Sequence, residues 1–481
     1  MEHRETKQRA VCVFTDWVST FIAFFLFNIF RFYFLHLGGA HRQLIDYLLS
    51  SKMIFEQATV PVVLLFIYWL SGYYNRPFER SRLNELLVTI YSQAFNAILI
   101  YLAALTNDQV YLRRENWMLL LFLFLILFTV TYIGRIIVTD RMLANLKKHD
   151  RRPRTVIIGL SEESVALATK LSSPDSKPRI GLIAFLPIGN EKIPSEKLTQ
   201  FKDVSILEGM GALKEMCTLN MVDQVIIVPP AGKTSYKKIL YFLYHLYPFD
   251  ISIKINPDIF SIITPTIRLE DILGEPFIDL SRPQISEFSK NVKRTLDVLI
   301  SGVGLLILSP FLAMIAAGVK MSGPGKVFYT QERIGRHRKP FRIIKFRSMN
   351  EDAEKDGVPR LSGDNDARIT RMGRWMRKYR IDELPQFWNV LKGEMSLVGP
   401  RPEREYFIEQ IVKKAPWYTL VLQVRPGITS WGMVKYGYAT NTDQMIERNR
   451  FDLIYLTNMS VVVDFKILIH TIKTVGSGAG K

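Results

Sequence analysis

The sequence predicts a membrane protein that combines α-helices with an α/β domain. The first third holds four long apolar stretches, the middle alternates short β-branched runs with helical segments, and the last third contains an apolar stretch interrupted by Ser309-Pro310. The 481 residues carry a net charge of +18 and are 48% hydrophobic, a combination that favours a surface facing anionic lipid. We expect a four-helix transmembrane block at 1–145, a Rossmann-like α/β domain at 146–275, and a mostly helical domain at 276–481 that contains the interrupted apolar stretch.

Each of the four apolar stretches is long enough to cross a hydrocarbon core of about 30 Å at about 1.5 Å per residue. Basic residues precede the first stretch and follow the second and the fourth. The positive-inside rule therefore places both ends of the block in the cytoplasm. The stretches are residues 11–37, 53–74, 83–105 and 117–138.

The middle of the chain predicts a doubly wound parallel sheet. Short apolar or β-branched runs at 155–159, 180–185 and 224–228 read as strands, and 162–171 reads as the helix after the first strand. The turn Gly159-Leu-Ser-Glu-Glu-Ser164 lacks the second and third glycines that let a backbone approach a pyrophosphate. We therefore expect a structural or regulatory domain rather than a dinucleotide site.

The apolar stretch at 296–319 leaves two topologies open. A fifth transmembrane helix is the plain interpretation of its length. Both flanks are basic, however, so both ends prefer the cytoplasm, as in a helix that breaks at Ser309-Pro310 and returns to the same leaflet. Such a break frees backbone carbonyls near Pro310, and the hydroxyl of Ser309 could satisfy one of them.

An acidic pair follows an arginine-rich segment in the C-terminal part. Asp382 and Glu383 come after a run of cations at 371–380, and Pro385 suits the first turn of a new helix. We expect Asp382 to be the N-cap of that helix, Gly393 to end it, and the carboxylate to stay ionised at neutral pH. Ordinary capping would explain the pair by itself, but so many neighbouring cations favour a polyanionic substrate such as a diphosphate.

Seven motifs then stand in the order found in one family. The chain resembles the bacterial sugar transferases, the polyprenyl-phosphate glycosylphosphotransferases that initiate exopolysaccharide or O-antigen synthesis, and the match covers about 290–476. The motifs are Lys293-Arg-Thr-Leu-Asp297, Ser309-Pro310, Gln331-Glu-Arg-Ile-Gly335, Lys345-Phe-Arg-Ser-Met349, Asp382-Glu-Leu-Pro-Gln386, Gly399-Pro-Arg-Pro402 and Arg425-Pro-Gly-Ile-Thr429.

The resemblance implies transfer of a sugar phosphate from a UDP-hexose to undecaprenyl phosphate, with release of UMP. It implies a ping-pong mechanism through a phosphosugar on Asp382, with Glu383, together with Asp382, as ligand of a required Mg²⁺. Glucose and galactose are the leading sugars, and an N-acetylated or diamino sugar stays open. Substrate-binding candidates are Lys345, Arg347, Arg377, Arg401 and Arg425.

The resemblance also places the catalytic domain on the cytoplasmic face of the bacterial inner membrane, among membrane lipids. Since nucleotide sugars are cytoplasmic, it favours the re-entrant topology at about 293–320, with Ser309 and Pro310 at the kink. Nucleic acid is not an expected partner, because the sequence shows no zinc-finger, RNP or helix-turn-helix signature. A catalytically silent scaffold or sensor that binds polyprenyl phosphate, and a hydrolase, remain alternatives, and a homodimer is one open oligomeric state.

Overall fold

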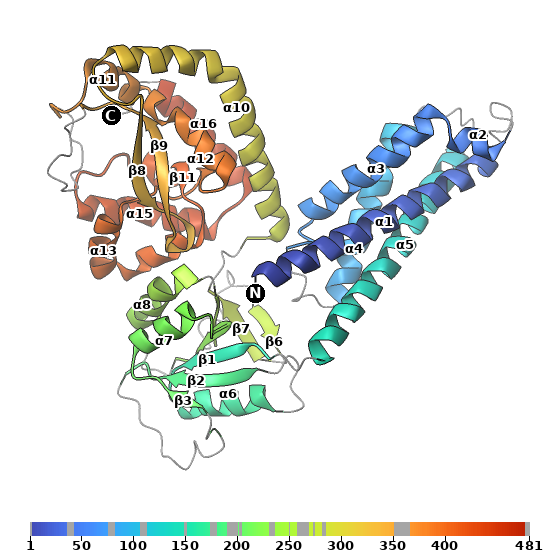
Figure 1. Cartoon of the computed structure of the whole chain (residues 1–481), viewed down its shortest axis with the longest axis horizontal. Helices are drawn as coiled ribbons and strands as arrows, with labels where there is room; N and C mark the ends of the chain where they lie inside the picture. Colours follow the sequence, from blue (N-terminus) through green and yellow to red (C-terminus); the bar gives the residue numbers. More distant parts are fainter. Residues whose placement is uncertain are drawn as a thin grey trace. The chain divides into compact units, whose positions relative to one another are not determined.

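The computed structural model divides into two compact units, Met1–Arg151 with Ser286–Val292, and Arg152–Ile285 with Lys293–Lys481 (Figure 1). Several apolar helices and a largely parallel sheet make this a membrane-associated α/β protein. The structure describes residues 2–35, 43–75, 82–105, 113–148, 152–173, 180–189, 201, 204–229, 236–249, 251–256, 269–272, 275–280, 285–350 and 366–476.

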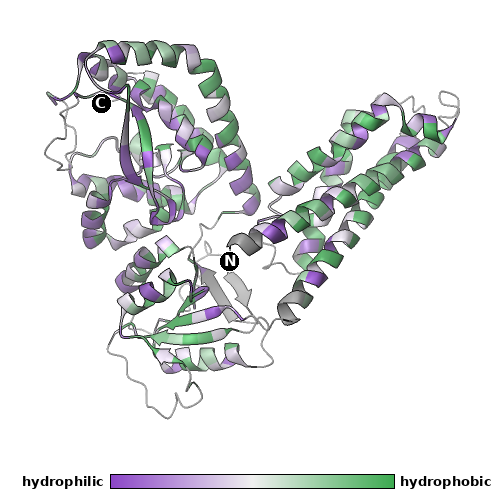
Figure 2. Ribbon diagram, in the orientation of Figure 1, coloured by the Kyte–Doolittle hydropathy of each residue, from purple (hydrophilic) through white to green (hydrophobic). Residues whose placement is uncertain are grey.

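The first unit is built of helices. Four of them, α1, α3, α4 and α5, are long and apolar enough to cross a membrane, as the sequence predicted. Hydrophobic residues, coloured green in Figure 2, make up much of these helices, a composition that suits a lipid environment. The helices are α1 (Glu2–Phe34), α2 (Leu44–Leu48), α3 (Ser51–Leu70), α4 (Arg82–Ile100), which continues as the π-helical turn η2 (Tyr101–Leu105), and α5 (Arg113–Lys148).

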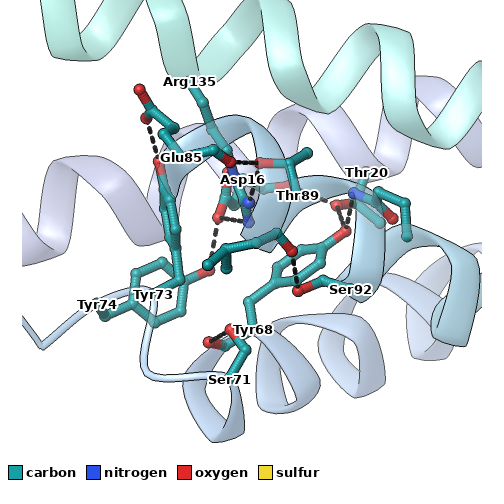
Figure 3. A network of polar contacts seen from close by, with 12 residues as sticks. Asp16, Thr20, Tyr68, Ser71, Tyr73, Tyr74, Glu85, Thr89, Ser92 and Arg135 are labelled. Carbon is teal, nitrogen blue, oxygen red and sulfur yellow. Dashed lines mark hydrogen bonds and ion pairs between the residues drawn. The ribbon is translucent and has the colours of Figure 1, made fainter. Parts of the chain in front are cut away.

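A buried polar network crosses the middle of this unit (Figure 3). Arg135 of α5 donates from Nε and Nη2 to the carboxylate of Asp16 on α1, at 3.0 and 2.8 Å, and from Nη1 to Thr89 on α4 at 2.9 Å. Its guanidinium also lies over the rings of Tyr68 and Tyr73. The network therefore ties α1, α3, α4 and α5 together through groups whose polar atoms are paired. Further members are Thr20, Tyr74, Glu85, Gln93 and Thr139.

The α/β part of the second unit contains the predicted parallel sheet. The order β3-β2-β1-β4-β5 is all parallel and is the Rossmann order, and β7 and β6 extend it antiparallel. The strands are β1 (Arg154–Ile158), β2 (Gly181–Leu186), β3 (Ser205–Ile206), β4 (Gln224–Ile227), β5 (Ser252–Ile255), β6 (Leu269–Ile272) and β7 (Glu275–Asp279).

Helices cover both faces of this sheet because the side chains of its strands alternate. On β1, Val156 and Ile158 face the core under α7 (Met210–Thr218) and α8 (Tyr236–Leu246), whereas Ile157 faces α6 (Glu162–Ser172). The doubly wound prediction is confirmed. Gly159 makes the first turn at φ +120°, where a Cβ would lie 2.2 Å from the carbonyl oxygen of Val228.

The C-terminal part shares its hydrophobic core with the sheet. Residues of α13 (Glu405–Lys414) and of the 3₁₀ segment η7 (Pro416–Gln423) belong to the same hydrophobic cluster as α7 and α8. The antiparallel β8–β9 hairpin carries Lys345 on its second strand, opposite Tyr329. Its elements are α10 (Glu287–Met321), β8 (Phe328–Ile334), η5 (Arg336–Arg338), β9 (Pro340–Phe346), α11 (Arg371–Lys378), η6 (Ile381–Gln386), α12 (Phe387–Lys392), β10 (Ser396–Val398), α13 (Glu405–Lys414), η7 (Pro416–Gln423), β11 (Gly427–Thr429), α14 (Trp431–Lys435), α15 (Thr442–Thr457) and α16 (Val461–Gly476).

Helix α10 is one continuous helix rather than two broken pieces, and Figure 1 shows that it bends sharply partway along. Pro310 lacks the N–H that would bond the carbonyl of Leu306, four residues earlier. The hydroxyl of Ser309 donates to that same carbonyl at 2.7 Å, as the sequence suggested. The helix therefore bends without breaking because its neighbour satisfies the acceptor that the proline frees.

Candidate active site

Asp382 and Glu383 lie in the 3₁₀ turn η6, and both are buried. Arg380 precedes them in the left-handed region at φ +52°, which redirects the chain after α11. The prediction that Asp382 is an N-cap is wrong, because α12 begins only at Phe387, with Gln386 at its N-cap. Gly393 ends α12 at φ +88°, as predicted.

Three cations from three separate segments of the chain, one strand and two loops, surround Glu383. Lys345 of β9 places Nζ 2.6 Å from Oε1, Arg380 places Nη1 3.5 Å from Oε2, and Arg401 places Nη1 3.8 Å from Oε1. Burial alone would raise the pKa of Glu383, but Lys345, Arg401 and Arg380 outweigh it and hold that pKa below its usual range. Glu383 is therefore a permanent negative charge inside a basic shell.

Asp382 behaves differently from its neighbour. Burial, and then the negative charge of Glu383, raises the pKa of Asp382, while Lys345, Arg377 and Arg380 act in the opposite direction. This outcome differs from the expectation of a readily ionised N-cap carboxylate. A carboxylate of raised pKa is a stronger base once ionised, and any further cation that enters the site favours its ionised form.

The structure brings only some of the predicted basic residues to the pair. Lys345 and Arg401 contact Glu383, and Arg377 donates from Nε to Ser348 at 2.9 Å, near enough to lower the pKa of Asp382. Ser309 and Pro310 lie within α10, as described above.

Arg347 and Arg425 bind backbone carbonyls instead. Arg347 donates from Nη2 to Val319 and Gly323, where α10 ends. Arg425 donates from Nε to Gly393 at 2.8 Å, and burial, with the charges of Arg336 and Arg294, lowers its pKa to about 10. The arrangement gives both residues a structural part, and a direct substrate contact for either stays a prediction.

Sequence reasoning missed the support beneath Arg401. Arg333 donates from Nη1 to the carbonyl of Pro402 at 3.1 Å, and the buried Glu403 pairs with Arg448 at 2.5 Å and with Arg333 at 3.5 Å. This buried ion-pair network fixes the turn that carries Arg401. Only burial reveals it, because Arg448 belongs to none of the seven motifs.

The acidic pair also fits a Mg²⁺ ion by its donor set. Among the described residues, no three His, Cys, Asp or Glu side chains gather into a protein-only metal cluster. Magnesium needs no such cluster, because it takes one or two carboxylates and completes its shell with substrate phosphates and water. Asp382 and Glu383 would supply those two carboxylates, and a bound cation would favour the ionised form of Asp382, whose pKa burial and the charge of Glu383 raise.

Comparison with known proteins identifies the family of the C-terminal part. The family model described as "Bacterial sugar transferase" matches residues 288–478. The chain is 42% identical over 189 residues to the UDP-N-acetylgalactosamine-undecaprenyl-phosphate N-acetylgalactosaminephosphotransferase of Aeromonas hydrophila, covering 39% of this chain and 44% of the relative. It is 39% identical over 224 residues to the UDP-glucose:undecaprenyl-phosphate glucose-1-phosphate transferase of Escherichia coli (strain K12), covering 46% and 48%.

A shorter relative is matched over most of its length. The exopolysaccharide production protein ExoY of Rhizobium meliloti (strain 1021) is 38% identical over 201 residues, covering 38% of this chain and 84% of the relative. The chain spans about half the length of the two longer relatives above. The protein belongs to the bacterial sugar transferase family.

Proposed function

We propose that the protein transfers a hexose-1-phosphate from a UDP-sugar to undecaprenyl phosphate and releases UMP, as the first membrane step of exopolysaccharide, capsule or O-antigen synthesis. The names of the Aeromonas hydrophila and Escherichia coli relatives specify N-acetylgalactosamine and glucose, respectively, so the sugar is left to experiment. The observation that carries the proposal is the buried Asp382–Glu383 pair inside a shell of three cations.

The proposed mechanism is ping-pong through Asp382. A carboxylate oxygen of Asp382 attacks the phosphorus that bears the sugar, the bond from that phosphorus to the bridging oxygen breaks, and UMP leaves with that oxygen. A phosphate oxygen of undecaprenyl phosphate then attacks the same phosphorus and restores the carboxylate. Lys345, Arg380 and Arg401 oppose the negative charge that both steps gather around Asp382.

Asp382 and Glu383 would hold the Mg²⁺ ion, which would supply positive charge against the negative charge of the diphosphate. Lys345, Arg401 and Arg380 lower the pKa of Glu383 and so favour its ionised form. Glu383 would therefore orient the site, and Asp382 would carry the sugar phosphate.

The same proposal includes a re-entrant α10 with the catalytic domain on the cytoplasmic face of the inner membrane. Before the bend, Arg294 donates to the carbonyls of Val390 and Leu391 on α12. After the bend, Ile315 and Val319 pack with residues of β9 and α11. Both halves thus hold the same small domain, whereas a straight span would carry one half away from it.

The surface around Pro310 also supports insertion into lipid. Leu306 and Ile307, which precede it, are 75% and 70% exposed. A large exposed apolar surface on a helix that binds its own domain on the opposite side suits a membrane. A cysteine-accessibility scan tests the topology, and labelling of positions after Met321 from the periplasm would contradict it.

The function is tested by UMP release from purified protein against a panel of UDP-sugars, with and without undecaprenyl phosphate. The panel includes glucose, galactose and their N-acetylated forms. We expect sustained release with at least one sugar that depends on the lipid phosphate. Release that water alone sustains would indicate a hydrolase, and no release with any sugar would indicate a scaffold or sensor.

A further inference from the structure

One aromatic side chain lies beside both of the arginines that pair with Glu383. Tyr438 follows α14, outside the seven sequence motifs. Its ring centroid lies 5.0 Å from Cζ of Arg380 and 5.5 Å from Cζ of Arg401. These two arginines come from separate loops, and both reach Glu383. The ring of Tyr438 thus lies against both guanidinium groups.

The backbone holds this ring in place on both sides. Gly437 adopts φ +92°, a conformation that favours glycine, and its N–H donates to the carbonyl of Gly432 in α14. On the other side, Ala439 is buried in the core shared with the sheet, and the N–H of Thr440 donates to Gln444 at 2.8 Å. The ring is therefore anchored to two packed helices, α14 and α15, and not to a free loop.

The contacts suit arginines that must still bind a ligand. Attraction between a guanidinium and an aromatic face needs no acceptor atom, so it leaves the N–H donors of arginine available. The distances from Arg380 and Arg401 to Glu383 are 3.5 and 3.8 Å, much longer than the 2.6 Å of Lys345. Lys345 therefore makes the close ion pair with Glu383. The two arginines contact Glu383 only loosely, so most of their N–H groups can donate to the oxygens of a ligand.

We propose that Tyr438 is a positioning residue that holds Arg380 and Arg401 as a matched pair for the diphosphate of the nucleotide sugar. The inference rests on the proposed function, because it assigns the ligand of the same site. Burial, and then the charge of Glu383, raises the pKa of Tyr438, so the phenol stays neutral and acts through its ring rather than as a phenolate.

The test compares Tyr438→Leu, Tyr438→Phe and the control Tyr436→Leu, which changes an exposed tyrosine two residues away. UDP is titrated into each full-length protein by calorimetry, and KM and kcat are measured with the sugar that the panel identifies. Loss of two contacts of this kind should raise the dissociation constant of UDP and the KM about 5- to 30-fold in Tyr438→Leu, with a smaller change in kcat. Tyr438→Phe keeps the ring and should stay within about twofold of the unmodified protein.

Three outcomes would overturn the inference: unchanged UDP binding in Tyr438→Leu, an equal loss in Tyr438→Phe, or an equal loss in Tyr436→Leu. Thermal unfolding of each variant checks folding, and Tyr438→Met replaces Tyr438→Leu if the latter unfolds. Failure of the proposed function looks different, since the unmodified protein would then release no UMP with any sugar or would sustain UMP release without undecaprenyl phosphate. Unchanged binding in Tyr438→Leu within an active protein contradicts the role of Tyr438 alone.

Discussion

The buried pair between Arg135 and Asp16 gives a quantitative prediction for the helical unit. Both side chains are only 1% exposed, and they join helices through residues 119 positions apart. Asp16→Asn keeps the shape of the side chain but leaves a buried guanidinium without its counter-charge. Breaking a buried pair in this way costs about 3–5 kcal/mol.

Part of that loss is offset by contacts that the substitution leaves intact. Arg135 keeps its hydrogen bond to Thr89 and its positions over Tyr68 and Tyr73, so we expect a net loss of about 2–4 kcal/mol. At about 2–4 °C per kcal/mol for a unit of this size, Tm should fall by about 5–15 °C. The assay is thermal unfolding of purified protein in detergent or lipid discs, followed by a probe placed in this unit.

Two further variants make the result specific. The double replacement Asp16→Leu with Arg135→Met removes both charges and should recover most of the loss, because an apolar pair needs no desolvation. The control Arg82→Ala breaks an ion pair with Asp140 whose side chains are about half exposed, and it should cost less than about 1 kcal/mol. Equal Tm values for Asp16→Asn and Arg82→Ala would refute the reasoning.

Three other predictions concern the second unit. The charge of Lys345 lowers the pKa of both Asp382 and Glu383. In Lys345→Met the acid limb of the kcat/KM profile should therefore move to higher pH, and turnover at neutral pH should fall about 100-fold. An unmoved acid limb would contradict this role of Lys345. Burial raises the pKa of Asp452 to about 6, whereas an unfolded Asp has a pKa of about 3.9. The folded state therefore binds this proton more tightly than the unfolded state does. The resulting free energy of stabilisation, about 3 kcal/mol, is fully present below about pH 4 and is lost as the pH rises through 6. Asp452→Asn should flatten stability between pH 4 and 7 in denaturant titrations, and a slope equal to that of the unmodified protein would count against this. Pro310→Ala restores the missing N–H and should straighten α10. Ser309→Ala removes only one hydrogen bond, worth about 1 kcal/mol, so it should lower turnover much less than Pro310→Ala. Equal turnover in both variants would argue against a functional bend.

Local patterns in the sequence predicted most of the elements correctly. Apolar length marked α1, α3, α4 and α5, and β-branched runs marked β1, β2 and β4. The capping glycine Gly393 and the donor role of Ser309 also follow from chemistry within a few residues. Such features depend on neighbours along the chain, which a sequence displays directly.

The predictions that failed depend on contacts between distant segments. Asp382 is not an N-cap because Arg380 turns into the left-handed region, which no propensity of arginine indicates. The sequence offered Arg347 as a substrate-binding residue but could not show that it binds backbone carbonyls at the end of α10. Tyr438 belongs to none of the seven motifs, and only the folded chain brings Arg380 and Arg401 against its ring.

In the proposed ping-pong mechanism, the side chain of Asp382 holds the sugar phosphate between the two half-reactions. The direct measurement is mass spectrometry of the protein after brief incubation with the active UDP-sugar in the absence of undecaprenyl phosphate. We predict about one equivalent of UMP released per protein and a peptide carrying the phosphosugar on Asp382, lost in Asp382→Asn. A phosphosugar on another residue, or UMP release only when the lipid phosphate is also bound, would contradict the mechanism.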